Sequence, residues 1–202
     1  MKLPGIKLSS ITNKYDGAVL NIRTLIIIST CLFCAGLASG FFFTPDKLGL
    51  SEEISSLERL AQTLTPFHIS TVIFIYLKNL LALVISLLLG PFLCLAPIFT
   101  LLLNGWVISF VSLPLIRSGS VALLVVGILP HGIFEIPALI LGEAIALGFG
   151  LAILSLVAKR KWNMLGAVFR QNLRYFIIVI VLLIPAAFIE TFITPLLIAQ
   201  FI

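Results

Sequence analysis

The chain has few charged residues for its size. Of its 202 residues, 8 are acidic and 13 are basic, so charged types make up 10% of the sequence while hydrophobic types make up 60%. An ordinary soluble domain has about a quarter charged residues and about half apolar ones. The composition therefore excludes an ordinary soluble protein and predicts an integral membrane protein with apolar helices of about 20 residues.

Cysteine and histidine are also scarce. The three cysteines lie inside apolar segments, where cysteine behaves as a small buried hydrophobe, so no disulfide framework is expected. Cys31 and Cys34 have the spacing of a redox CxxC motif, but no βαβ pattern surrounds them. Of the two histidines, His68 follows Pro66 at the start of an apolar run and is expected at the membrane interface rather than in a catalytic site.

The motifs of common enzymes are missing. The sequence has no GxSxG elbow, no Walker loop and no dinucleotide-binding glycine pattern. We therefore predict no catalytic residue and no required cofactor. The net charge of +5 comes from basic residues beside the apolar runs, without the aromatic-interleaved patch of a nucleic-acid surface. Nucleic acid is not an expected partner.

Long apolar runs separated by polar connectors are what the chain does have. We expect a basic cytoplasmic arm at 1–20 and a single transmembrane helical domain at 21–202, with an amphipathic surface helix within 51–64. The fold class is all-α: a membrane bundle of about five spans plus a broken or re-entrant half-helix. Spans are predicted at about 21–43, 67–89, 93–113, 120–158 and 175–202.

Glycine and proline mark where these helices should break. The predicted structural breaks are Gly90, Pro91, Gly105, Pro130, Gly132 and Pro137. The segment 120–158 is too long for one ordinary span, and two alternatives are open for it. Either 121–129 is a half-helix that dips into the membrane and returns, or both halves of the segment cross the bilayer.

Basic residues favour the first alternative. The densest basic cluster, which we expect in the cytoplasm, comprises Lys159, Arg160, Lys161, Arg170 and Arg174. With the N-terminus also cytoplasmic, three spans bring the chain outside at Arg117, so one net crossing must return it. A re-entrant half-helix and one long span satisfy this count and place the C-terminus outside. Six full crossings remain the alternative.

Ionisable side chains inside the apolar runs are the candidate functional residues. His131 and Glu135 are four residues apart, so on a helix they lie on one face and can share a proton or a cation. Glu143 and Glu190 are further candidates. Three interpretations stay open: a hydrogen-bonded polar plug between helices, a proton-linked site, or a metal site with His131, Glu135 and Glu190 as candidate ligands.

Small residues on the first span indicate close helix packing. Gly36 and Gly40 form a small-xxx-small surface, which lets another helix backbone approach. Packing within the chain is favoured over a dedicated dimer face, and a homodimer is left open.

Several polar residues form a pattern that resembles a known family. The pattern consists of Asn79, Asn104-Gly105, Pro130-His131-Gly132 with Glu135 and Pro137, and Ala187-Phe188-Ile189-Glu190 with Thr194-Pro195. It resembles the stage II sporulation protein M family of polytopic membrane proteins. The resemblance implies an integral protein of the cytoplasmic membrane, and in spore-forming bacteria such proteins look like the membrane anchor of a peptidoglycan-degrading machine. It also adds Asn79, Asn104 and Glu190 as neighbours of His131. Lys78 departs from the family, which tends to have a second asparagine there.

The expected function is that of a non-enzymatic scaffold or anchor in the cell membrane, with a buried His/Glu/Asn polar centre. Its expected partners are the lipid bilayer and other membrane or envelope proteins. The first alternative is a transporter or channel for a proton, a cation or a small solute that uses His131, Glu135 and Glu190. The second alternative is an intramembrane metal-dependent hydrolase.

Overall fold

The computed structural model describes residues 21–44, 49, 52, 65–160 and 165–201. This part of the chain is helical and contains no strand. In chain order, its elements are α1 (Ile22–Gly40), α4 (Ile69–Leu89), α5 (Leu95–Arg117), α6 (Val121–Ala158), α7 (Leu165–Phe188), the π-helical turn η4 (Ile189–Ile193) and α8 (Thr194–Ile198). Five helical segments are long and apolar enough to cross a membrane. The predicted all-α membrane fold is confirmed.

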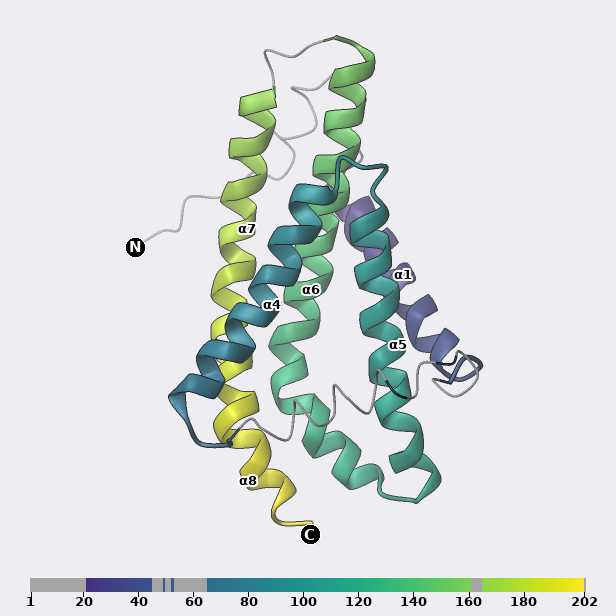
Figure 1. The fold of residues 1–202 in the computed structure, drawn as a ribbon, viewed down its shortest axis with the longest axis vertical. Coiled ribbons are helices and arrows are strands. Elements are labelled where there is room, and N and C mark those ends of the chain that lie inside the picture. Colours follow the sequence, from purple (N-terminus) through teal and green to yellow (C-terminus); the bar gives the residue numbers. More distant parts are fainter. Residues whose placement is uncertain (1–20, 45–48, 50–51, 53–64, 161–164, 202) are drawn as a thin grey trace.

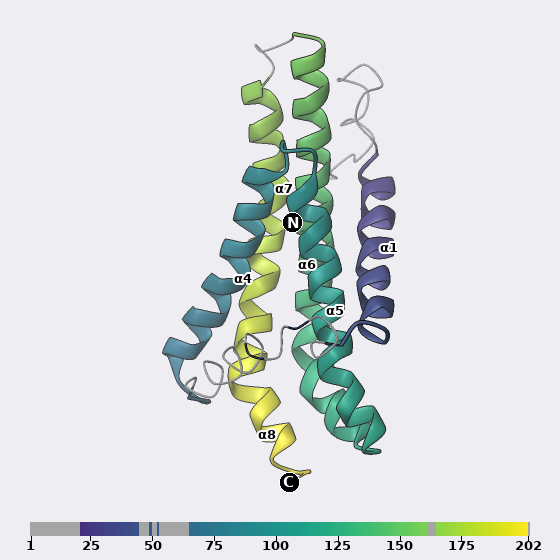
Figure 2. The ribbon, with the colours of Figure 1, turned by 45° about the vertical axis from the view of Figure 1, so that its right-hand side comes forward.

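The central helix of the bundle is α6. It contacts α1, α4, α5 and α7 as well as η4 and α8. In Figures 1 and 2, α4 and α7 lie on one side of α6, whereas α5 and α1 lie on the other. Two apolar cores follow from this arrangement, one among α4, α6 and α7 and one among α1, α5 and α6. Every residue of α6 from Gly142 to Gly150 is buried between them.

Glycines set how closely the helices approach at two places. A Cβ added at Gly150 on α6 would overlap the carbonyl of Gly90, where α4 ends and the turn into α5 begins. A Cβ at Gly36 on α1 would overlap the carbonyl of Leu102 on α5, and one at Gly105 would overlap the carbonyl of Phe33. The small surface of α1 therefore packs within the chain, and Gly90 ends a helix as predicted.

The predicted break and re-entrant half-helix in 120–158 are wrong. Residues Val121–Ala158 form one helix of 38 residues, with Pro130, Gly132 and Pro137 inside it. A proline removes one backbone donor and crowds the preceding turn, which bends a helix without ending it when neighbouring helices support it. Figure 1 shows the consequence, because the first turns of α6 run obliquely before the helix turns along the bundle. At 1.5 Å per residue the helix is about 57 Å long, so it extends beyond about 30 Å of hydrocarbon.

One further predicted break and two helix boundaries differ from the sequence-based ones. Gly105 does not break α5, and that helix continues through Pro114 to Arg117, past the predicted end at 113. The last long helix begins at Leu165, ahead of the predicted start at 175. Its first turns contain polar and basic residues, so the apolar pattern does not include them. The arm at 1–20 and the surface helix within 51–64 lie outside the described residues.

Candidate functional site

The bent part of α6 provides the first two side chains of the site. His131 and Glu135 are one turn apart, and the imidazole Nε2 lies 3.9 Å from the carboxylate Oε2 of Glu135. The side chains are 14% and 28% exposed, respectively, so both are largely covered yet reachable from the surface. Their shared face is the one that the four-residue spacing predicts.

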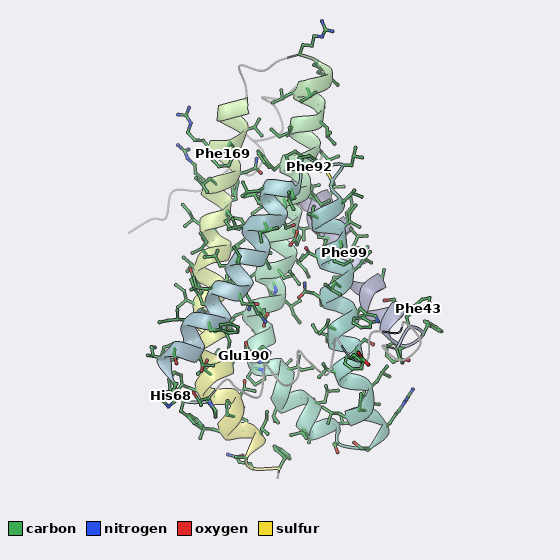
Figure 3. The ribbon with its side chains drawn as sticks, viewed as in Figure 1. Phe43, His68, Phe92, Phe99, Phe169 and Glu190 are labelled. Carbon is green, nitrogen blue, oxygen red and sulfur yellow. The ribbon has the colours of Figure 1, made fainter. Side chains whose placement is uncertain are left out.

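The third ionisable side chain comes from the other end of the sequence. Glu190 lies in the π-helical turn between α7 and α8, where the Thr194 amide bonds to the Ile189 carbonyl five residues earlier. One ligand atom from each of His131, Glu135 and Glu190 lies within 4.8 Å of the other two. Figure 3 labels Glu190 in the lower part of the bundle, where α4 and α6 also pass. We call these three residues the acid–imidazole centre.

Two neutral side chains contact the outer polar atoms of His131 and Glu135. The Asn79 amide on α4 donates a hydrogen bond of 3.0 Å to Oε1 of Glu135. The Thr194 hydroxyl on α8 lies 3.4 Å from Nδ1 of His131. When Nδ1 carries the proton and donates to Thr194, the Nε2 lone pair faces Oε2 of Glu135. These two contacts involve Nδ1 of His131 and Oε1 of Glu135, so Nε2 of His131 and Oε2 of Glu135 remain as the ligand atoms that face each other.

A lysine lies beside the centre. Lys78 precedes Asn79 on α4, and its ammonium group interacts electrostatically with His131 and with Glu190. A lysine in the middle of a span is costly unless a carboxylate compensates it. The Lys78 side chain is exposed, and the local charge is one ammonium beside two acids when the imidazole is neutral.

Glu143 is not part of the centre. It is fully buried two turns further along α6, where Ser86 on α4 donates a hydrogen bond to its Oε2. Its Oε1 has no hydrogen-bond partner among the described residues. Compared with the Asn79–Glu135 contact, the Ser86–Glu143 contact lies seven residues later on α4 and eight residues later on α6. Helices α4 and α6 therefore run in the same direction and share two polar contacts.

Asn104 makes its hydrogen bond within one helix. Its side-chain amide donates a hydrogen bond of 2.8 Å to the Thr100 carbonyl on its own helix, α5. The proximity of Asn104 to His131 that the resemblance implies stays a prediction. Thr194 and Ser86 were missed as contact residues, although each has a signal in the sequence. Thr194 follows Glu190 by four residues, and Ser86 follows Asn79 by two helical turns.

An apolar pocket of about 410 Å³ lies between α5 and the oblique part of α6. Neither His131 nor Glu135 lines it, because both are on another face of α6. Its lining is almost entirely hydrocarbon, and it includes Ile108, Leu124, Ile128, Gly132, Ile133 and Pro137. The pocket is chemically unsuited to a charged ligand and is distinct from the acid–imidazole centre.

The centre can hold a cation or exchange protons. An imidazole nitrogen and two carboxylates are acceptor groups, and Asn79 and Thr194 orient two of them.

Comparison with known proteins identifies the family. A model of the stage II sporulation protein M family matches residues 29–195, which is most of the chain. The "Uncharacterized protein MJ0706" of Methanocaldococcus jannaschii is 28% identical over 141 residues, covering 68% of this chain. The match spans 62% of the length of that relative. No solved structure matches the chain. The matched range contains His131, Glu135 and Glu190, and the chain belongs to the stage II sporulation protein M family.

Proposed function

We propose that the protein is a non-enzymatic membrane carrier or channel for a cation, protons included, and that the cation passes through the acid–imidazole centre. One observation carries the proposal: His131, Glu135 and Glu190 come together from two separate parts of the sequence, with ligand atoms within 4.8 Å. A charged side chain at the middle of a membrane helix costs roughly 3 kcal/mol. Bringing two acids and an imidazole together within apolar helices is therefore costly unless the group has a use.

Irregular helices at the centre support the same proposal. Membrane transporters commonly build ion sites where helices are interrupted, because the backbone there departs from regular hydrogen bonding. Here α6 contains Pro130 and Pro137 on either side of His131 and Glu135. Glu190 lies in a π-helical turn, and such turns are frequent at functional sites.

The proposed membrane is the cytoplasmic one, with the N-terminal side and the end of α6 in the cytoplasm. The five long helices alternate in direction in Figure 1, so the α4–α5 turn and the end of α6 lie at one end of the bundle. Lys159 and Arg160 follow α6 at that end, and basic residues are retained on the cytoplasmic side. The α5–α6 turn and the C-terminus would then face outward.

Flux through purified protein tests the carrier. The full chain is reconstituted into proteoliposomes, and proton and cation movement is followed under an imposed gradient. We expect Glu135→Gln to abolish the flux, because it removes a charge from the centre while keeping the side-chain shape. Glu143→Gln is the matched control on the same helix and should leave the flux unchanged. Equal flux for Glu135→Gln and the parent chain would refute the carrier.

A scaffold for envelope proteins is the second candidate. The observation that favours it is that Asn79–Glu135 and Ser86–Glu143 both join α4 to α6, as an interhelical lock requires. In that case the polar groups stabilise the bundle, and another surface recruits the partner. Crosslinking in the native membrane followed by co-purification should then recover one stoichiometric partner, whose retention does not depend on Glu135.

A further inference from the structure

We infer that the acid–imidazole centre binds a divalent transition-metal ion of the Zn²⁺ class, with His131, Glu135 and Glu190 as ligands. The inference rests on the proposed function and names the substrate class of the carrier. Its first support is the donor set. Imidazole nitrogen suits zinc and its neighbours in the first transition row, whereas magnesium and calcium prefer all-oxygen sites.

The distances fit a site that closes on an ion. Zinc binds nitrogen and oxygen ligands at about 2.0–2.2 Å, so neighbouring ligand atoms in a tetrahedral site are about 3.4 Å apart. Nε2 of His131 and Oε2 of Glu135 are 3.9 Å apart, and one ligand atom from each of the three residues lies within 4.8 Å of the other two. Closing the set requires side-chain movements of about 1.5 Å at most. Rotations of the two glutamates can supply them without moving a helix.

The outer contacts match what a metal site needs. A metal-bound histidine almost always donates its other ring N–H to an acceptor, and a metal-bound carboxylate is usually hydrogen-bonded as well. Thr194 is placed to accept from Nδ1 of His131, and Asn79 donates to Oε1 of Glu135. Three protein ligands leave a fourth position for water or for the next group along a path.

Lys78 gives the site a second property. Its ammonium group acts on His131 and on Glu190, so it repels a dication at the centre. A carrier must release its ion as well as bind it. Lys78→Met should therefore tighten metal binding, whereas loss of any ligand should weaken it. If the polar residues only stabilise the bundle, metal affinity should not rise with Lys78→Met and fall with loss of a ligand.

Equilibrium metal binding is the test, with Zn²⁺ titrated into the purified, metal-stripped full chain by calorimetry. Cys31 and Cys34 are exposed and could bind zinc themselves, so both are changed to serine throughout. We expect one Zn²⁺ per chain. Glu190→Gln should weaken binding on the order of 100-fold or more, and the outer substitution Asn79→Ala about 10- to 100-fold. Glu143→Gln is the control with unchanged affinity.

The outcomes separate this inference from the carrier. The metal site is refuted if the chain binds no Zn²⁺. It is also refuted if Glu190→Gln and Asn79→Ala both bind Zn²⁺ with the affinity of the parent chain. Proton flux that persists in such a chain leaves the carrier standing. One bound Zn²⁺ without flux of any ion supports the metal site and refutes the carrier. If Glu190→Gln fails to purify as a monodisperse protein, Asn79→Ala and Lys78→Met decide, because both leave the three ligands intact.

Discussion

The buried contact between Ser86 and Glu143 should couple the stabilities of α4 and α6. Ser86→Ala removes the hydrogen bond to Oε2 of Glu143, whose Oε1 already has no partner among the described residues. The fully buried carboxyl group would then lack both partners, at a cost of about 1–3 kcal/mol. Glu143→Leu leaves the Ser86 hydroxyl without its acceptor and should cost a similar amount.

Changing both residues should cost less than the two single changes together. The double variant Ser86→Ala with Glu143→Leu has no buried polar group left at this place, and replacing both partners by apolar groups can be nearly neutral. We expect it within about 1 kcal/mol of the parent chain. Hydrogen bonds between membrane helices couple by about 0.6 kcal/mol on average and about 1.7 at most, so the coupling energy should lie toward the upper value because Glu143 is fully buried.

Reversible unfolding in mixed micelles measures all four free energies of the cycle. Ser112→Ala on α5 is the matched control, because that hydroxyl bonds to the Ile108 carbonyl of its own helix. It should change the free energy of unfolding by about 0.5 kcal/mol or less. Additive effects of the two single substitutions, or a double variant less stable than both, would refute the view that this contact links the two helices.

Two further predictions concern packing and orientation. Gly150→Ala should lower the free energy of unfolding by about 1–3 kcal/mol because its Cβ overlaps the Gly90 carbonyl, whereas Gly127→Ala, which meets open space, should raise it by about 0.5–1 kcal/mol in the same unfolding assay. In a cysteine-free chain in intact cells, a cysteine at Ser118 should react with a membrane-impermeant thiol reagent, and one at Lys159 only after permeabilisation; the reverse pattern would contradict the proposed orientation.

Hydropathy was sufficient for the membrane class and for the approximate spans, because length and apolarity are the properties that a bilayer selects. It was insufficient for α6. Pro130 and Gly132 predict a break from local preference, but both lie inside α6, whose backbone continues with a bend. The polar first turns of α7 were missed for the opposite reason, since a helix that extends beyond the hydrocarbon carries no apolar signal there.

Spacing along one helix predicted part of the candidate site. The four-residue interval of His131 and Glu135 is enough to place both on one face. Glu143 shows the limit of that argument, because eight residues keep it on roughly the same side of α6 but move it to a different partner, Ser86. The approach of Glu190 depends on how α7 packs against α6, and no local pattern contains that information.

The π-helical turn η4 adds one residue to the chain between α7 and α8. Each residue of an α-helix advances the chain by about 100° around its axis, and η4 contains one residue more than a regular turn would use. Deleting one apolar residue from Ile189–Ile193 would leave hydropathy almost unchanged. The four residues left would form one regular turn, so Thr194 and α8 would keep nearly the same orientation relative to α7. A one-residue change of length at this turn is therefore absorbed within it, and it should shift Glu190, which lies inside the turn, more than it shifts the Thr194 contact with His131.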